Sequence, residues 1–195
     1  MTTLVLASKS PARLKTLRNA GIEPAVIVSG VDESVLDGLP PKELALGLAR
    51  LKAEAVAPQA PKDALVVGCD SVLEFEGRPL GKPEDAEEAI LRWKRMRGRS
   101  GVLVTGHAVV RGDELVATTA ETMVHFADVS DAEIEAYVAT GEPLHVAGAF
   151  TVDSLGGAFI TSIEGDFHNV VGISLPLLRE LLGRLDVRWT DLWAG

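Results

Sequence analysis

The chain has 195 residues, of which 47% are hydrophobic and 24% charged, the composition of one globular domain or of two small lobes that share a core. Against 19 Lys and Arg residues stand 28 Asp and Glu residues, which gives a formal net charge of -9 at pH 7. This balance excludes nonspecific binding to a nucleic acid polymer or to an anionic membrane surface. Any anionic ligand must therefore meet a local cluster of cations.

A single cysteine, Cys69, excludes an internal disulfide framework and a zinc site built from four cysteines. Nothing resembling a signal peptide precedes the first predicted strand, and no run of ~18 apolar residues offers a membrane span. We therefore expect a cytoplasmic protein with no membrane partner.

The first half of the chain alternates between predicted strands and helices. Short apolar runs predict strands at 4–7, 25–28 and 64–70. The third run is apolar throughout and stops on a carboxylate, which is typical of a strand buried on both faces. Apolar residues at helical spacing, with prolines near the start, predict helices over 11–19 and 41–56.

The second half contains one clear hairpin among further helices and loops. The predicted elements are, in chain order, a turn-rich loop 77–83, a helix 84–96 with Glu84 and Asp85 in its first turn, strands 102–110 and 115–126, a capping-box helix 130–140, a glycine-rich loop 141–157, a strand 158–163, a helix 174–185, and a tail whose Trp189 and Trp193 pack back on the body. This order favours one α/β unit with a mixed sheet.

Polar residues gather around the start of the first predicted helix. Ser8, Lys9, Ser10 and Arg13 place hydroxyls and positive charges where free backbone N–H groups and the helix dipole favour a phosphate. The alternative is an ordinary helix that Ser10 caps, with Lys9 and Arg13 in solvent.

Asp70 is the second candidate. We expect it at the carboxyl end of a buried strand, where open α/β sheets place their ligands. A half-buried aspartate needs a cation, a metal or hydrogen-bond donors. The alternative is that Asp70 only caps the following turn.

Three further charged residues have weaker local signals. Lys82 follows Gly81 in a loop that differs from a P-loop in its glycine spacing and in having Pro83 where Ser or Thr would bind magnesium. A lysine held in such a loop can still contact phosphate. Lys52 in the second predicted helix and Glu33 in a polar stretch are, on composition alone, surface charges.

The histidines and the cysteine give a negative result. The 4 histidines lack the spacing of a zinc site, and we expect His107 and His125 to be packed in strands. Cys69 lies inside the apolar run, where a small core side chain is expected, although a Cys69-dependent hydrolase is a rival hypothesis.

Between Leu4 and about Leu185, an ordered series of short motifs resembles the Maf-like family of nucleoside triphosphate pyrophosphatases. The motifs are Leu6-Ala7-Ser8-Lys9-Ser10-Pro11-Ala12-Arg13, Val31-Asp32-Glu33, Ala49-Arg50-Leu51-Lys52-Ala53, Asp70, Leu80-Gly81-Lys82-Pro83, Thr105-Gly106, Glu142-Pro143-Leu144, Ala147-Gly148-Ala149-Phe150 and Asn169-Val170-Val171-Gly172. Each motif alone is weak, whereas the ordered set is specific.

The resemblance implies an α/β fold with a mixed elongated sheet, flanking helices and two lobes around a central cleft, all within a single domain over 1–195. It also implies hydrolysis of a nucleoside triphosphate to the monophosphate and pyrophosphate with a divalent cation. Ser8, Ser10 and Arg13 would bind the phosphate chain, because phosphoryl transfer requires positioning and charge neutralisation.

The resemblance also suggests roles for the remaining charged candidates. Lys52 and Lys82 would stabilise charge that develops during attack. Glu33 and Asp70 would bind Mg²⁺ or Mn²⁺ or orient a water, with Asp70 as the proton acceptor, since hard cations prefer carboxylate oxygens. We also expect a homodimer.

Three positions depart from the family pattern. Ala12 replaces the first of two arginines, and Ser71 and Asp153 match neither the family branch that prefers dTTP and UTP nor the branch that prefers methylated guanine. We therefore expect base selectivity to depend on these positions. A nucleotide-binding regulator of cell division with little turnover is the alternative function.

Overall fold

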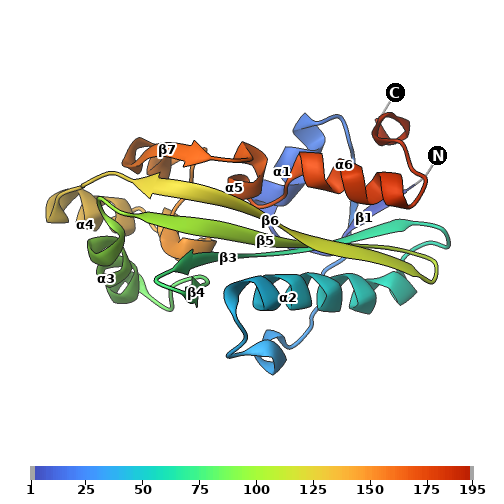
Figure 1. Cartoon of the computed structure of the whole chain (residues 1–195), viewed down its shortest axis with the longest axis horizontal. Helices are drawn as coiled ribbons and strands as arrows, with labels where there is room; N and C mark the ends of the chain where they lie inside the picture. The colour runs from blue at the N-terminus through green and yellow to red at the C-terminus, as the bar shows by residue number, and fades with distance from the viewer. Residues whose placement is uncertain (1–2, 194–195) are drawn as a thin grey trace.

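The computed structural model describes residues 3–193, which form a seven-stranded mixed sheet with helices on both faces (Figure 1). The strands are β1 (Leu4–Leu6), β2 (Ala25–Val26), β3 (Leu65–Phe75), β4 (Arg78–Leu80), β5 (Ser100–Arg111), β6 (Glu114–Phe126) and β7 (Ile160–Glu164). Their spatial order is β2-β1-β3-β5-β6-β7, with β4 also paired to β3. β1 runs parallel to β2 and β3, and the other neighbours are antiparallel. The predicted α/β class with a mixed sheet is confirmed.

Helices cover both faces of this sheet. The α-helices of the described residues are α1 (Pro11–Asn19), α2 (Pro41–Val56), α3 (Ala86–Met96), α4 (Asp131–Ala139), α5 (Phe167–Val171) and α6 (Leu175–Arg184). The short 3-10 helices are η1 (Glu33–Leu36), η2 (Ala57–Gln59), η3 (Glu142–His145), η4 (Ala147–Ala149), η5 (Leu155–Phe159) and η6 (Trp189–Leu192). Figure 1 shows α2 along one face, α1, α5 and α6 against the other, and α3 and α4 at one end. Within residues 3–193 no helix is long and apolar enough to cross a membrane.

β3 is longer than the sequence analysis predicts. It continues through Asp70 to Phe75, because β5 pairs with it as far as Glu74 and β4 pairs with Leu73, Glu74 and Phe75. The prediction that the strand ends at Asp70 is wrong, and so is the alternative that Asp70 caps a turn. Asp70 instead lies in the middle of the strand.

Other differences are local. The predicted loop 77–83 contains β4, which joins β3 through a tight turn at Glu76 and Gly77 with positive φ angles of 52° and 74°. Asp85 is the N-cap of α3 rather than a residue of its first turn. α5 is too short to show helical periodicity in the sequence. In the tail, Trp189 packs against the core and the ring of Trp193 lies against Gly21, as predicted, although Trp193 stays half exposed.

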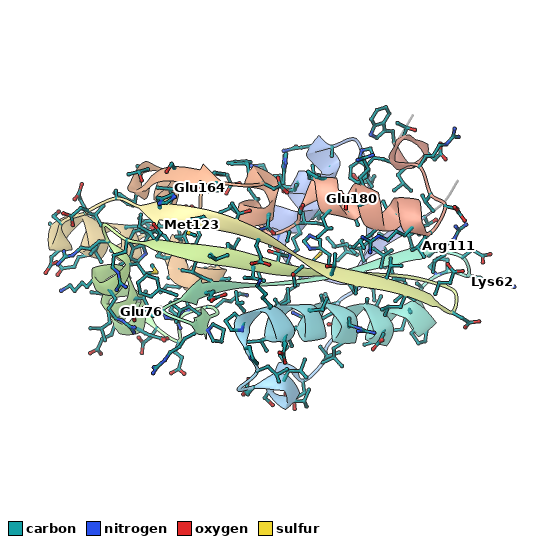
Figure 2. The ribbon with its side chains drawn as sticks, in the orientation of Figure 1. Lys62, Glu76, Arg111, Met123, Glu164 and Glu180 are labelled. Atoms are coloured by element: carbon teal, nitrogen blue, oxygen red, sulfur yellow. The ribbon has the colours of Figure 1, made fainter. Side chains whose placement is uncertain are left out.

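The hydrophobic core is divided along the length of the sheet. One cluster packs β1 and the start of β3 against α1 and α6, and another packs the end of β3 against α3 and α4 around Trp93. A third lies beneath α2. Figure 2 shows how far apart the ends are, with Glu76 at the β3–β4 turn and Arg111 at the end of β5 on opposite sides of the molecule. The middle of β3 therefore lies between separately packed regions.

Two glycines let the backbone of α2 approach the sheet. A Cβ atom on Gly68 would lie 2.2 Å from the carbonyl oxygen of Ala49, and one on Gly106 would lie 2.1 Å from that of Ala45. Real Cβ atoms do not approach backbone oxygens so closely. The close contact sets the distance between α2 and β3, and hence the reach of every side chain on the buried stripe of α2.

Gly106→Ala is expected to lower the free energy of unfolding by about 1–3 kcal/mol, because the added methyl group must displace the backbone of α2. The control is Gly183→Ala in α6, where nothing lies within 4 Å of the added methyl group. This control should raise the free energy of unfolding by roughly 0.5–1 kcal/mol through helix propensity. Urea unfolding measures both, and a Gly106→Ala variant as stable as the parent would contradict the close packing.

Candidate active site

The candidate site lies where one edge of β3 has no strand partner. β1 and β4 pair with the same edge, but β1 ends opposite Val67 and β4 pairs no farther back than Leu73, while β5 covers the other edge. The open stretch, residues 68–72, is named the β3 gap below. The chain leaves β1 toward Ser8 and leaves the antiparallel β4 toward Lys82. Both segments therefore enter the gap, from opposite ends.

On the α2 face of the gap, one ammonium group joins two carboxylates. Nζ of Lys52 donates to Oδ1 of Asp70 at 2.5 Å and lies 2.8 Å from Oε1 of Glu33. The side chains of Lys52 and Asp70 are only 11% and 14% exposed, whereas that of Glu33 is 55% exposed. The structure thus brings these three candidates together. The interpretation of Lys52 as a solvated surface charge is wrong, because its side chain is buried between two carboxylates.

Local structure explains how Lys52 and Glu33 reach this position. Lys52 lies on the buried stripe of α2, between Ala49 and Val56, and so projects toward the sheet. Glu33 is the first residue of η1, and the side chain of Asp32 caps this turn by accepting a hydrogen bond from the Ser34 N–H. The cap holds the start of η1 in place.

The carboxylate pair suits a cation that shares its ligands with a substrate. In enzymes that act on phosphate esters and anhydrides, one or two carboxylates hold Mg²⁺, and waters and substrate phosphates complete its coordination. Glu33 and Asp70 are such a pair, joined through Lys52. Among residues 3–193 no group of three or more His, Cys, Asp or Glu side chains could form a complete protein cage for a metal. Lys52 donates to Oδ1 of Asp70, and no described residue bonds Oδ2.

On the opposite face, Arg13 of α1 gathers hydroxyl groups around the gap. Its Nη1 donates to Oγ of Ser8 at 3.2 Å, its Nη2 to Oγ of Ser71 at 3.1 Å, and its Nε to the carbonyl of Gly172 at 2.7 Å. Ser10 caps α1, since its Oγ accepts from the Arg13 N–H at 3.4 Å. A guanidinium has five N–H donors, so these three bonds leave two for an anion.

The Lys52 and Arg13 clusters lie on opposite faces of the sheet, and the open edge of β3 is what gives access from one to the other. Successive strand residues point to opposite faces, so Asp70 faces Lys52 while Ser71 faces Arg13. A strand paired along this edge would separate the clusters. A ligand that contacts both must lie across the β3 gap.

The remaining candidates have less defined surroundings. Ala12 is half buried beside Arg13 on α1, and Lys82 is exposed in the segment that follows β4. Asp153 is exposed between η4 and η5. No hydrogen bond or ion pair within residues 3–193 joins Asp153 to the Lys52 or Arg13 cluster.

A chain of hydroxyl groups behind Ser71 was not assigned a role from the sequence. Oγ of Ser71 lies 2.8 Å from Oγ1 of Thr105, which donates to the carbonyl of Asn169 at 3.4 Å. Because Ser71 accepts from Arg13, its own hydrogen is free to bond Thr105. The amide of Asn169 is fully buried and donates to the carbonyl of Leu103 at 3.1 Å. Thr105 and Asn169 both belong to the family motifs given in the sequence analysis, and this membership was the signal that could have identified them.

His107 is a core residue, as the sequence analysis predicts. Its Nδ1 lies 3.0 Å from the carbonyl of Thr105, and its Nε2 accepts from the backbone N–H of Ser174, the N-cap of α6, at 2.8 Å. The accepting Nε2 requires the neutral ring with its hydrogen on Nδ1. Burial lowers the pKa of His107 to about 4. The ring therefore links β5 to α6 in its neutral form.

Glu142 holds the loop that carries Asp153. Its carboxylate accepts from the Tyr137 hydroxyl at 3.0 Å, from the Thr151 hydroxyl at 2.5 Å and from the backbone N–H groups of 155–156. Burial alone would raise the pKa of Glu142, but these donors outweigh it and lower the pKa to about 2. The contacts give the glycine-rich segment one conformation although it has little regular structure.

Cys69 lies next to Asp70 but points into the core. It is completely buried, and burial raises the pKa of its thiol to about 11. A thiolate nucleophile is therefore disfavoured here, and the expectation of a small core side chain is confirmed.

The fold and this site define an α/β protein that brings cations, hydroxyls and carboxylates to one open strand edge. The family model described as Maf-like protein matches residues 3–185, and the chain belongs to that family. Two relatives, both named nucleoside triphosphate pyrophosphatase, come from Salinispora tropica and Cutibacterium acnes. The first is 59% identical and covers 98% of this chain and 87% of its own; the second is 57% identical and covers 100% and 96%. Among solved structures, the Staphylococcus aureus Ham1 protein aligns with 98% of this chain and 94% of its own at 17% identity, with a TM-score of 0.45.

The free energy of unfolding is expected to rise with pH between about pH 4 and pH 6.5 because of His107. In this window the imidazole of the unfolded chain binds a proton while the buried ring does not, so acid favours the unfolded state by up to roughly 3 kcal/mol at the lower end. Urea unfolding across this range measures the slope, and His107→Gln should remove this part of it. The same slope in the variant would show that His107 is not its source.

Proposed function

We propose that the protein hydrolyses a nucleoside triphosphate to the monophosphate and pyrophosphate, with the triphosphate lying across the β3 gap. The observation that carries this proposal is the pair of clusters on the two faces of the gap, a lysine with two carboxylates and an arginine with two hydroxyls. Membership of the Maf-like family and the printed names of the relatives support the same reaction. The cytoplasm is the proposed compartment and a homodimer the proposed assembly.

The Arg13 cluster is proposed to bind the phosphate chain. Arg13 retains two N–H donors, and the positive end of the α1 dipole lies beside Ser8 and Ser10. The backbone N–H groups of Ser10 and Arg13 already donate to Oγ of Ser8 and Ser10, and Pro11 has none. The contact with Gly172 fixes the guanidinium plane before a ligand arrives. Preorganised donors of this kind stabilise phosphate charge without reorganisation during the reaction.

The Lys52 cluster is proposed to carry out the chemistry. Asp70 accepts the proton of the attacking water, and Lys52 holds Asp70 in orientation while neutralising charge that develops on the phosphate. Lys82 adds positive charge from the β4 end of the gap. Glu33 and Asp70 would hold Mg²⁺ or Mn²⁺, which when bound neutralises phosphate charge.

Base selectivity is proposed to depend on Ala12, Ser71 and Asp153. Ser71 lies in the hydroxyl chain between Arg13 and Thr105, so its side chain is held at the gap. Ala12 is half buried next to Arg13 on α1, at the position where the family pattern has an arginine. Asp153 is on the loop held by Glu142.

A nucleotide panel tests the reaction. With Mg²⁺ or Mn²⁺, purified protein incubated with dTTP, UTP, CTP and modified nucleotides is expected to release pyrophosphate and the monophosphate in equal amounts. Separate assays for pyrophosphate, monophosphate and orthophosphate follow the products. Release of orthophosphate alone would overturn the proposal. Tight nucleotide binding with negligible hydrolysis would favour the regulator of cell division instead.

Asp70→Asn is expected to lower kcat by about 10²- to 10⁴-fold, the usual contribution of a positioned general base. Lys52 keeps a carboxylate partner in Glu33, so the variant should remain folded. The matched control is Glu54→Gln, an exposed acid on α2, which should leave kcat unchanged. Steady-state kinetics and thermal unfolding are measured on both. Full activity in Asp70→Asn would remove Asp70 from its proposed role.

A further inference from the structure

The carbonyl group just before Lys82 is held by two donors from distant parts of the chain. The oxygen of Gly81 accepts from Nη1 of Arg92 at 2.7 Å and from the backbone N–H of Gly148 at 3.0 Å. Gly148 is itself fixed, because a Cβ atom there would lie 2.8 Å from Cβ of Leu73 in β3. The exposed lysine therefore follows a backbone group that is tied to both α3 and η4.

The guanidinium of Arg92 is oriented by a carboxylate one turn earlier on α3. Oε1 of Glu88 accepts from Nε at 3.0 Å and from Nη2 at 2.6 Å, while Nη1 points to Gly81. The other oxygen, Oε2, accepts from the backbone N–H of Glu84 at 2.6 Å. The side chain of Arg92 is only 12% exposed. A planar fork joins a carboxylate and a carbonyl in one rigid arrangement, which a lysine could not reproduce.

The path of the chain explains why this contact matters for the β3 gap. β4 is antiparallel to β3 with Leu80 opposite Leu73, so the next residues run toward Ser71 and Asp70. Strand pairing stops at Leu80, and the ladder no longer fixes the backbone beyond it. Beyond Leu80, the two hydrogen bonds to the Gly81 carbonyl hold the backbone instead, one residue before Lys82.

We propose that Arg92, oriented by Glu88, is a positioning residue that sets the place of Lys82 at the β3 gap. This inference rests on the proposed role of Lys82 in stabilising charge during attack. Without the guanidinium, Gly81 keeps only its bond to Gly148, and Lys82 samples more positions. A displacement of about 1 Å can cost roughly 10²-fold in rate when the charge must be placed for the transition state.

The chain offers a matched control in Arg97. Its guanidinium also joins a backbone carbonyl and a carboxylate, those of Val129 and Asp131, both through Nη1 at 3.2 and 2.6 Å. These contacts lie at the start of α4 and not in the segment after β4. Loss of Arg97 therefore removes similar bonds without releasing Lys82.

Arg92→Met is expected to lower kcat by about 10- to 100-fold with a change in KM below about threefold, because Lys82 acts on the transition state. Arg97→Met should keep kcat within about twofold, although it too loses hydrogen bonds to a backbone carbonyl and to a carboxylate. Thermal unfolding of both variants checks that stability does not account for the difference. Equal kcat in Arg92→Met and the parent would overturn the proposal.

A double-mutant cycle separates positioning from a structural role. In a Lys82→Met background, Arg92→Met should cause no further loss of kcat, because the residue that it positions is already absent. The same fold loss in both backgrounds would overturn the positioning role while leaving the role of Lys82 intact. Parental activity in Lys82→Met would instead overturn the proposed role of Lys82 and this inference with it.

If Arg92→Met does not fold, Glu88→Gln takes its place in the cycle, since it keeps the guanidinium and removes only the charge that orients it. The expected loss of kcat is smaller, about threefold to tenfold, and should again vanish in the Lys82→Met background. An equal loss in both backgrounds would contradict the proposal.

Discussion

The open edge of β3 between β1 and β4 is the constraint on which the arrangement of the site depends. β5 pairs with the other edge of β3, and successive strand residues alternate, so Asp70 and Ser71 project to opposite faces at a stretch where neither β1 nor β4 covers the near edge. Helices on both faces can therefore bring side chains to a single ligand position. The same edge receives the segments that follow β1 and β4, which carry Ser8 and Lys82.

The buried pair of Lys52 and Asp70 is poor evidence for stability, because removing two charges from water costs about as much as their attraction returns. Its position is better explained by chemistry. With Lys52 held between two carboxylates, the excess positive charge at the β3 gap comes from Arg13 and Lys82. The chain as a whole carries a formal net charge of -9, so the positive region at the β3 gap is small. A small positive region in a negative surface favours binding of a nucleotide over binding of a longer polyanion.

Segments with little regular structure are held by single charged side chains. Glu142 gathers the glycine-rich segment, and Arg92 holds the backbone before Lys82. Glu142 satisfies the backbone N–H groups of Leu155 and Gly156, and Arg92 shares the Gly81 carbonyl with the backbone N–H of Gly148. A site that must place charge accurately requires such contacts wherever its residues lie outside regular strands and helices.

Local signals in the sequence determined α1, α2 and the β5–β6 hairpin, because caps, prolines and turns act on neighbouring residues. The ordered motifs also identified Ser8, Arg13, Glu33, Lys52 and Asp70 as candidates, and the structure brings these residues to the β3 gap. The length of β3 was not predictable, since a carboxylate inside a strand resembles its end until the pairing with β5 is known. Only the tertiary structure decided which face each residue occupies and that Arg92 reaches Gly81, because such contacts depend on how separate elements pack and leave no local pattern.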